Sequence, residues 1–316
     1  MAAVPPFPAR PLTRTSAGPG SPDTAAVLAV DIGGTKLAAG LVGSEGQLSS
    51  ASQVPTPTED DAGSVWRALA ELVEELAASG ERRVVACGVG CGGPMTAGGE
   101  LVSPLNIRGW RRFPLRRQLS ELTRLPTYVD NDAKALAVGE GWCGAATGRS
   151  DFLGMVVSTG VGGGVVVDGR LIGGRLGNAG HVGHVVVEPD GRECSCGGRG
   201  CLEAEASGTA IAAATGRPAA FASPEVVERT GTLVGRAVAS VAALCDLDLA
   251  VVGGSVALGF GRPFFDAAQR ELSARARLDF CADARIVPAA LGEDGPLVGA
   301  GAVGWLGVGC RLGGGR

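Results

Sequence analysis

Residues 25–36 read Ala25-Ala-Val-Leu-Ala-Val-Asp-Ile-Gly-Gly-Thr-Lys36 and give the clearest indication of the fold. A short apolar run ends here in an acidic residue and a pair of glycines, and a second apolar run, 37–42, follows directly. Apolar runs of this length on either side of a glycine turn are typical of buried strands. We therefore predict a β-hairpin at the start of the ordered chain.

The same unit occurs a second time. An apolar run at 152–157 leads into Ser158-Thr-Gly-Val-Gly-Gly163, and a further apolar run, 164–167, follows. This pattern predicts a second hairpin with a glycine-rich tip at 158–163. Two copies of one unit in a chain of 316 residues favour two similar α/β halves with a cleft between them.

The remaining sequence alternates between helical and strand-like patterns, which is typical of the α/β class. We expect an N-terminal lobe at 26–130, a larger C-terminal lobe at 131–295, and a terminal helix at about 296–310 that returns to the first lobe. Proline-rich residues 1–25 are expected to form a disordered tail. The expected helices are 61–78, 111–124, 133–142, 207–214, 224–244 and 299–306, and the further strands are 84–89, 127–129 and 249–252.

Composition and charge exclude several classes of function. The chain has 28 basic and 32 acidic residues, a net charge of −4, and no basic block, which argues against nucleic-acid binding. There is neither an uninterrupted apolar run long enough to span a membrane nor the apolar segment of a signal peptide. We expect a cytoplasmic protein with no nucleic-acid or membrane partner.

The chain has only two histidines, His181 and His184, just upstream of a cysteine cluster. His184, Cys194, Cys196 and Cys201 form a Cys3His set, which is a closed tetrahedral shell for structural zinc. An odd total of nine cysteines in a chain of this length favours metal over a disulfide framework. The alternative is unpaired thiols in a glycine loop. His181 either competes as a ligand or, as we favour, points into the neighbouring cleft.

The first glycine turn carries a candidate phosphate site. Gly33 and Gly34 allow backbone N–H groups to approach phosphate oxygens, Thr35 adds a donor, and Asp31 can hold Mg²⁺ or its waters. The alternative is an ordinary hairpin turn. The second glycine loop, 158–164, favours the phosphate site, although neither loop has Walker A or dinucleotide-binding spacing.

Asp130-Asn131-Asp132 lies between an expected strand and an expected helix. Polar residues at such a position are often only helix N-caps. A capping role explains one of these three residues well, but it does not explain all three. A carboxylate at a strand end can instead accept the proton of a substrate hydroxyl during phosphoryl transfer. Asn131 beside it can hydrogen-bond a sugar hydroxyl.

With these motifs, the chain resembles the ROK family (repressors, open reading frames, kinases), whose kinases phosphorylate hexoses with ATP. The resemblance runs from about residue 27 to about residue 305. It rests on Asp31–Lys36, Asn131-Asp-Ala-Lys-Ala135, 158–164, and Gly-His184 with Cys-x-Cys-x4-Cys-x-Glu. It implies the duplicated, actin-like (ribonuclease-H-like) α/β ATPase fold with two lobes and a central cleft, and a homodimer.

The resemblance also implies a role for individual residues. Asp132 becomes the general base on the sugar hydroxyl, and Gly253-Gly254 become the glycine loop on the adenosine side. Without the resemblance, Asn106 would be interpreted as an ordinary turn asparagine, and Glu203 as a solvent-exposed carboxylate at the start of a helix. The implied sugar contacts are Gly93, Asn106, Asn131, Asp132, His184 and Glu203. The implied contacts to the phosphates of MgATP are Asp31, Gly33, Gly34, Thr35, Lys36, Thr159, Gly160, Gly162 and Gly163.

One residue departs from the family pattern. Family kinases usually have Glu-x-Gly-His, whereas this chain has His181-Val-Gly-His184. A neutral imidazole offers one acceptor and one donor, so it cannot reproduce the hydrogen bonds that a carboxylate accepts. We therefore predict that His181 contacts the substrate and decides which sugar is used, with glucose as the default.

The predicted function is ATP-dependent phosphorylation of a hexose or hexose derivative, with Zn²⁺ as a structural ion and Mg²⁺ bound with ATP. The alternative is a sugar-responsive regulator of the same family without kinase activity. Repressors of the family carry a helix-turn-helix domain before the strand that begins here at Val27. The 26 residues before it are too few and too rich in proline for such a domain.

Overall fold

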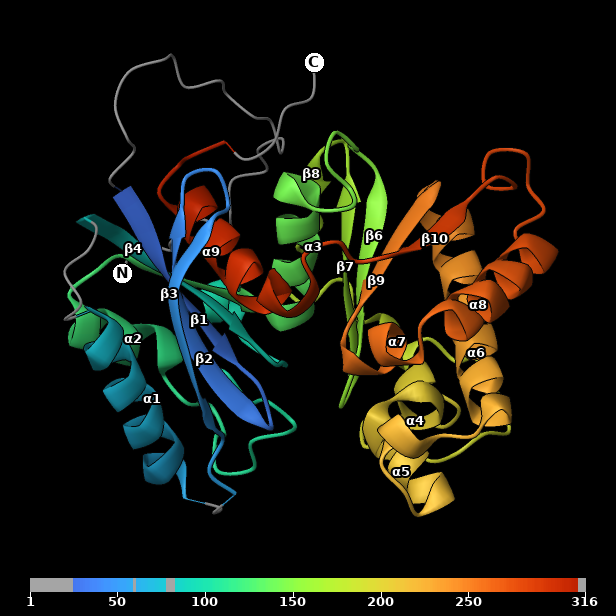
Figure 1. Ribbon diagram of the computed structural model, residues 1–316, viewed down its shortest axis with the longest axis horizontal. Coiled ribbons are helices and arrows are strands. Elements are labelled where there is room, and N and C mark those ends of the chain that lie inside the picture. Colours follow the sequence, from blue (N-terminus) through green and yellow to red (C-terminus); the bar gives the residue numbers. More distant parts are fainter. Residues whose placement is uncertain (1–24, 59–60, 78–82, 312–316) are drawn as a thin grey trace.

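Two five-stranded sheets, described by a computed structural model at residues 25–58, 61–77 and 83–311, form the framework of the protein (Figure 1). The first sheet has the order β3-β2-β1-β4-β5 and the second has the order β10-β9-β6-β7-β8. The strands of the first are β1 (Ala25–Ile32), β2 (Lys36–Gly43), β3 (Leu48–Pro55), β4 (Arg83–Cys91) and β5 (Thr127–Asn131). Those of the second are β6 (Phe152–Val157), β7 (Val161–Val167), β8 (Arg170–Leu171), β9 (Leu249–Gly253) and β10 (Arg285–Pro288).

The two sheets repeat one topology. In the first, β1 is antiparallel to β2 and parallel to β4. In the second, β6 is antiparallel to β7 and parallel to β9. Read from β8, the second sheet therefore has the strand order of the first, and the duplicated α/β fold predicted from the sequence is confirmed.

Helices cover the outer faces of both sheets and fill the space between them (Figure 1). The outer helices are α1 (Ala62–Ala77) and α2 (Leu115–Thr123) on the first sheet, and α6 (Pro224–Cys245) and α8 (Arg262–Arg275) on the second. Three short helices, α4 (Leu202–Ala206), α5 (Gly208–Thr215) and α7 (Ser255–Phe260), belong to the second lobe. None of the helices in the described parts of the chain is long and apolar enough to cross a membrane.

The two central helices exchange lobes. Helix α3 (Asp132–Cys143) follows the last strand of the first sheet but packs on β6 and β7 of the second. Helix α9 (Gly295–Gly307) follows β10 of the second sheet but packs on β1, β4 and β5 of the first. The chain therefore crosses between the lobes immediately before each of these helices (Figure 1).

The backbones of helices α3 and α9 are in direct contact because glycines lie at the interface between the two helices. A Cβ atom built on Gly299 would lie 2.5 Å from the carbonyl oxygen of Ala135, and one on Gly139 would lie 3.0 Å from the Gly299 Cα. Any side chain at these positions would push the helices apart. Close contact at this junction fixes the position of α3, the helix that begins at Asp132.

The structure corrects two predicted boundaries. The predicted helix 111–124 begins only at Leu115, because Phe113 pairs with Val102 and Pro114 follows it. Gly162 and Gly163, predicted to lie in the second hairpin tip, are inside β7 opposite Val156 and Met155. A Cβ on Gly162 would lie 2.8 Å from the Ala133 Cβ, so glycine is needed there for α3 to approach the sheet.

Both predicted hairpins are confirmed by the β1–β2 and β6–β7 pairings. Strands β3 and β10 and helix α8 were not predicted. The predicted tail at 1–25 lies outside the described residues except for Ala25.

A buried glutamate joins α3 to the second crossing between the lobes. Glu140 is fully buried, and its carboxylate accepts hydrogen bonds from the backbone N–H groups of Ala145 (2.7 Å), Ala290 (3.1 Å) and Leu291 (3.0 Å). Ala290 and Leu291 belong to the connection from β10 to α9. Glu140 thus ties this connection to α3.

We expect Glu140→Ala to lower the free energy of unfolding by about 3–5 kcal/mol, because it leaves three backbone donors without an acceptor. Urea denaturation measures this change. The matched control is Glu71→Ala at an exposed position on α1, which we expect to change stability by less than about 0.5 kcal/mol. A loss for Glu140→Ala as small as that of the control would contradict this role.

Candidate active site

Two carboxylates meet at the edge of the first sheet where three parallel strands end. Asp31 on β1 lies beside Gly90 on β4, and Gly90 lies beside Asp130 on β5, two residues before Asp132. A Cβ atom on Gly90 would lie 3.6 Å from the Asp31 Oδ1 and 3.5 Å from the Asp132 Cα. Gly90 therefore lies in contact distance of both residues, and Asp31 and Asp132 lie near each other at this end of the sheet.

The charges of these carboxylates are coupled. Burial, with a further contribution from the negative charge of Asp132, raises the pKa of Asp31 to about 7, while Lys36 opposes the shift. Burial also raises the pKa of Asp132, although the Ala133 N–H and His181 oppose the shift. Two such carboxyl groups are an oxygen donor set suited to Mg²⁺, which would favour their ionised forms.

Asn131 caps α3 with its side-chain oxygen, and its amide nitrogen remains available for another partner. Its side-chain oxygen accepts from the backbone N–H groups of Ala133 (3.1 Å) and Lys134 (3.4 Å), so it is the N-cap of α3. Its amide nitrogen faces the other way, 3.5 Å from a Cβ atom built on Gly93. The cap thus leaves one donor directed toward the predicted sugar site.

His181 reaches the same point from the second lobe. Its Nε2 lies 3.2 Å from the Cβ position of Gly93, and its Nδ1 lies 2.9 Å from the carbonyl oxygen of Asn178. Because a carbonyl oxygen only accepts, Nδ1 is the donor, and Nε2 of the neutral ring is an acceptor. His181 therefore lines the site and is not part of the cysteine cluster.

Asp130, in contrast, is used structurally. It forms a buried ion pair with Lys134 (2.7 Å), and it accepts a hydrogen bond from the backbone N–H of Asn131 (2.8 Å). Lys134 also donates to the carbonyl oxygen of Gly177 (3.0 Å). Of the three residues in the 130–132 motif, only the last two face the site.

The first glycine turn is held by a residue that the sequence patterns did not reveal. Thr56 is buried, and its hydroxyl donates to the carbonyl oxygen of Gly33 (2.8 Å). The backbone N–H of Thr56 donates to the carbonyl oxygen of Thr35 (3.1 Å). Asn106 covers the turn, because a Cβ atom on Gly34 would lie only 2.5 Å from the Asn106 Cβ. Lys36 donates to Gln53 (3.4 Å) at the exposed end of β2. The turn thus brings Asn106 next to the predicted phosphate loop.

The second glycine loop is fixed by neighbouring segments of its own lobe. The carbonyl oxygen of Thr159 accepts from Thr209, through both its hydroxyl (2.9 Å) and its backbone N–H (3.2 Å). Beside it, Gly254 has a φ of 95°, and a Cβ there would lie 2.4 Å from the Val157 carbonyl oxygen. Gly253 is the last residue of β9. The predicted ATP glycines Gly160 and Gly254 therefore belong to adjacent loops, whereas Gly162 and Gly163 do not lie at the tip.

Glu203 lies against this loop. Its Oε2 accepts a hydrogen bond from the backbone N–H of Val161 (3.0 Å) and is 2.9 Å from a Cβ position on Gly160. Its charge also contributes to the raised pKa of Asp132. Glu203 therefore connects the second glycine loop to the surroundings of Asp132.

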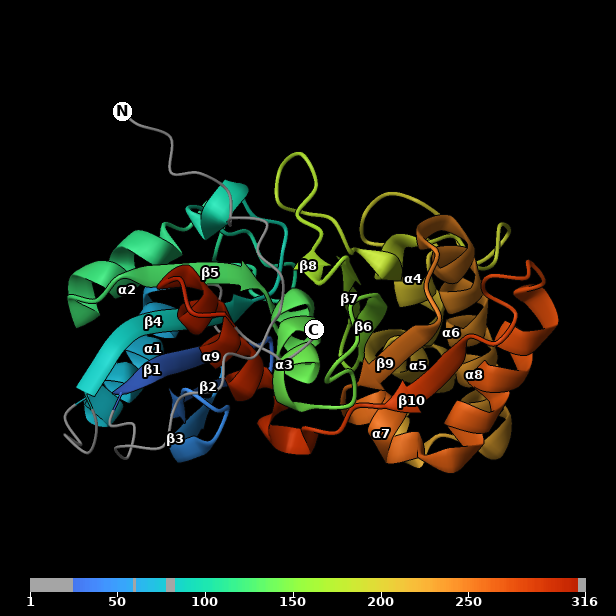
Figure 2. The same cartoon turned by 90° about the horizontal axis from the view of Figure 1, so that it is seen from above.

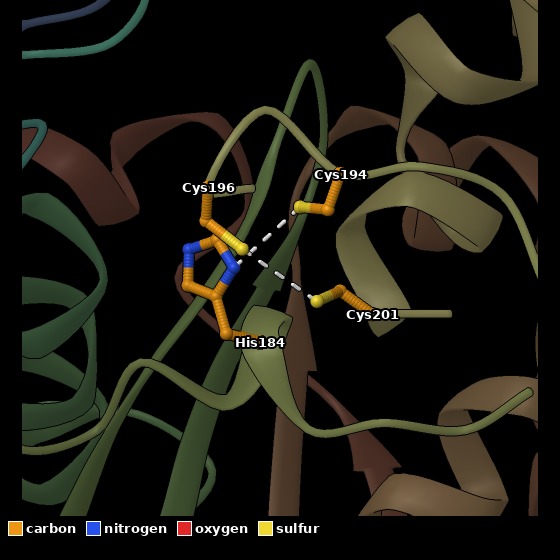
Figure 3. A group of neighbouring side chains, drawn as sticks. All are labelled: His184, Cys194, Cys196 and Cys201. Atoms are coloured by element: carbon orange, nitrogen blue, oxygen red, sulfur yellow. Dashed lines mark hydrogen bonds between the residues drawn. The ribbon is translucent and has the colours of Figure 1, made fainter. Parts of the chain in front are cut away.

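The four predicted zinc ligands gather at one point (Figure 3). Their candidate ligand atoms all lie within 4.8 Å of one another. Cys194 Sγ is 3.7 Å from His184 Nδ1, and Cys196 Sγ is 3.8 Å from Cys201 Sγ. Tetrahedral zinc with ordinary bond lengths separates two sulfurs by about 3.8 Å, and a sulfur from a nitrogen by about 3.6 Å. The donor set and its spacing therefore fit zinc.

This cluster joins two segments that carry site residues. His184 lies three residues after His181, and Cys201 lies two residues before Glu203. Between them, the backbone N–H of Leu202 donates to the carbonyl oxygen of Val185 (2.9 Å). A metal ion held by the cluster would fix both segments relative to each other.

The family model and the similar proteins of known name indicate the same family. The ROK family model matches residues 27–304. The N-acetylmannosamine kinase of Escherichia fergusonii is 40% identical over 250 residues, which cover 74% of this chain and 84% of that protein. Many further proteins match as well.

Two solved structures are similar over nearly their whole length. The ROK family glucokinase from Streptomyces griseus, in complex with glucose and AMPPNP, has a TM-score of 0.78 and 30% identity, covering 88% of this chain and 99% of its own. The ROK hexokinase from Thermus thermophilus has a TM-score of 0.74 and 35% identity, covering 90% of this chain and 99% of its own. Both sheets, the two-lobe actin-like fold and the family model agree: the chain belongs to the ROK family.

Proposed function

We propose that this protein transfers the γ-phosphoryl group of ATP to a hydroxyl of a hexose derivative, with N-acetylmannosamine as the first candidate. The observation that carries the proposal is the pair of buried residues Asp31 and Asp132, which both lie next to Gly90 and whose charges interact. The N-acetylmannosamine kinases at 39–40% identity support the choice of sugar.

Asp132 is the proposed general base. In phosphoryl transfer, the attacking hydroxyl loses its proton to a carboxylate, while the phosphate charge is neutralised by cations and backbone N–H groups. Asp31 would hold Mg²⁺ or its waters, and that ion would supply charge neutralisation on the phosphates. The raised pKa of Asp132 makes it a stronger base than an ordinary aspartate.

The residues around Asp132 divide between the two substrates. We propose that Asn106, Asn131, His181, His184 and Glu203, together with the backbone at Gly93, surround the sugar. The turn Gly33–Lys36, Thr159 and Gly160, and Gly253-Gly254 would bind ATP. A zinc ion on the Cys3His cluster would hold the segments of His181 and Glu203 in place. A homodimer remains our expectation.

His181 is the proposed specificity residue. Its Nδ1 is occupied by the Asn178 carbonyl oxygen, so the neutral ring presents one acceptor, Nε2, to the site. A glutamate at this position would present two acceptor oxygens. We therefore expect a sugar that directs a single donor at this position, such as the N–H of an acylated amine, to fit His181 best.

Glucose is the second candidate. It is supported by the glucokinase of Streptomyces griseus, which shares the fold at 30% identity. A coupled ADP-release assay over N-acetylmannosamine, N-acetylglucosamine, glucose, mannose, fructose and allose tests the proposal. We expect the highest kcat/KM on N-acetylmannosamine. Sugar binding without ADP release on any sugar would instead support the regulator.

His181→Glu tests the specificity assignment separately. We expect the ratio of kcat/KM for N-acetylmannosamine to that for glucose to fall by about tenfold. The reason is that the single imidazole acceptor for a sugar hydrogen bond is replaced by the two acceptor oxygens of a carboxylate. The control is Arg175→Glu, an exposed residue in the preceding loop, which should leave the ratio unchanged. An unchanged ratio in His181→Glu would show that other residues select the sugar.

A further inference from the structure

Hydrogen bonds between Asn178 and Met95, which we call the clasp, join the two lobes beside the proposed sugar site. The loop after β8, residues 172–181, rises between the lobes (Figure 2) and carries Asn178. The Asn178 side chain donates to the carbonyl oxygen of Met95 (3.0 Å) and accepts from its backbone N–H (3.3 Å). Met95 belongs to the first lobe, so one side chain satisfies both backbone groups of a residue across the lobe boundary.

The same residue orients His181. The backbone carbonyl oxygen of Asn178 accepts the hydrogen bond from His181 Nδ1 (2.9 Å). Its side-chain amide also donates to the carbonyl oxygen of Leu176 (3.3 Å), which fixes the shape of the loop. Asn178 is therefore bonded to the first lobe through its side chain and to the ring of His181 through its backbone.

The two ends of this connection lie close to the contact between Gly93 and His181. Met95 lies two residues after Gly93, whose Cβ position is 3.2 Å from His181 Nε2. Movement of Met95 relative to Asn178 would therefore change the distance between Gly93 and the ring of His181. The base of the loop is fixed independently, since Lys134 of α3 donates to the carbonyl oxygen of Gly177 (3.0 Å).

We propose that Asn178 is a positioning residue for the sugar: it clasps the first lobe at Met95 and thereby holds the acceptor Nε2 of His181 against the site. This inference rests on the proposed function. It assigns to Asn178 no contact with the substrate, so its effect must pass through His181. Sugar selection should therefore depend on a residue outside the pocket.

The hydrogen bonds of Asn178 are a small part of what holds the two lobes together. Asn178 is half-buried in a surface loop, whereas the lobes are held together by the apolar core around α3 and α9. Loss of its hydrogen bonds should lower the midpoint of urea denaturation by less than Glu140→Ala does, because Asn178 is half-buried whereas Glu140 is fully buried. A change in kinetics can therefore be separated from a change in folding.

The test uses Asn178→Ala and Asn178→Asp in the full chain. Aspartate keeps an acceptor for the Met95 N–H but places a carboxylate oxygen against the Met95 carbonyl oxygen. For both variants we expect the KM for N-acetylmannosamine to rise about tenfold, with kcat changed less than KM and the KM for ATP unchanged. Arg175→Ala, at an exposed position in the same loop, is the matched control and should behave as the wild type.

A double-mutant cycle with His181→Ala decides whether Asn178 acts through His181. We expect Asn178→Ala to raise the KM for the sugar by less than twofold once His181 is alanine. Additive effects, or an unchanged KM in Asn178→Ala, would overturn the proposal. Failure of the wild type to phosphorylate any sugar would instead count against the proposed function, so the two failures are distinguishable.

Discussion

Asp132→Asn should reduce kcat by about 10²–10⁴-fold, the range that a positioned general base contributes. The amide cannot take the proton of the attacking hydroxyl, yet it has nearly the same shape as the carboxyl group. Sugar affinity, measured by titration calorimetry, should therefore change little. The other carboxylate of the motif cannot replace it, because Asp130 is paired with Lys134.

The matched control is Asp168→Asn. Asp168 is an exposed residue in the turn between β7 and β8, with a φ of 51° that asparagine also adopts. This control should retain full activity. An Asp132→Asn variant with wild-type kcat would exclude Asp132 as the base.

The pH profile provides a second check on Asp132. Its raised pKa means that the carboxylate form is lost at a higher pH than for an ordinary aspartate. Because the base acts only when ionised, kcat/KM of the wild type should increase as the pH rises through this pKa. The acidic limb of the profile should therefore lie above the usual range for aspartate.

Cys201→Ser should remove about one zinc ion per chain, because structural zinc needs all four ligands of a closed shell. Metal content is measured by mass spectrometry of the purified protein. The apparent binding free energy of structural zinc reaches about 10–16 kcal/mol in small domains, so we also expect a clear fall in the thermal midpoint. Sugar affinity should fall as well, since Glu203 and His181 lie on the segments that the cluster joins.

Cys245→Ser is the control for the zinc prediction. Cys245 is the last residue of α6 and does not belong to the cluster. It should retain the metal and the sugar affinity of the wild type. Wild-type protein that contains no zinc when purified without chelator, or a Cys201→Ser variant that retains it, would contradict the assignment.

Much of the fold could be predicted from the sequence because its signals are local. The apolar runs on either side of 33–34 and 158–163 specify two hairpins, and their recurrence indicates a duplicated fold. The cysteine spacing likewise indicates a shared metal site, because all four ligands lie in one short stretch of the chain, 184–201. Glycines in β7 were misplaced for a physical reason: Gly162 serves the close approach of Ala133 on α3, a contact that only tertiary structure reveals.

The supporting residues of the site could not be predicted. Thr56, Glu140 and Asn178 bond to the backbone of residues far away in the chain, at Gly33, Ala290 and Met95. Backbone acceptors and donors leave no trace in the sequence, because every residue except proline carries both. The signal for Asn178 was especially weak, since an asparagine between glycine and alanine reads as an ordinary loop residue.

Asp31 and Asp132 together are proposed to support phosphoryl transfer to a sugar. The most direct measurement is ³¹P NMR of the purified protein incubated with Mg²⁺, ATP and N-acetylmannosamine, beside the same reaction with Asp132→Asn. We predict a sugar phosphate signal that grows with ADP in the wild type and is absent in the variant over the same time. ADP that appears only with inorganic phosphate, or a sugar phosphate signal of equal size in the variant, would contradict the claim.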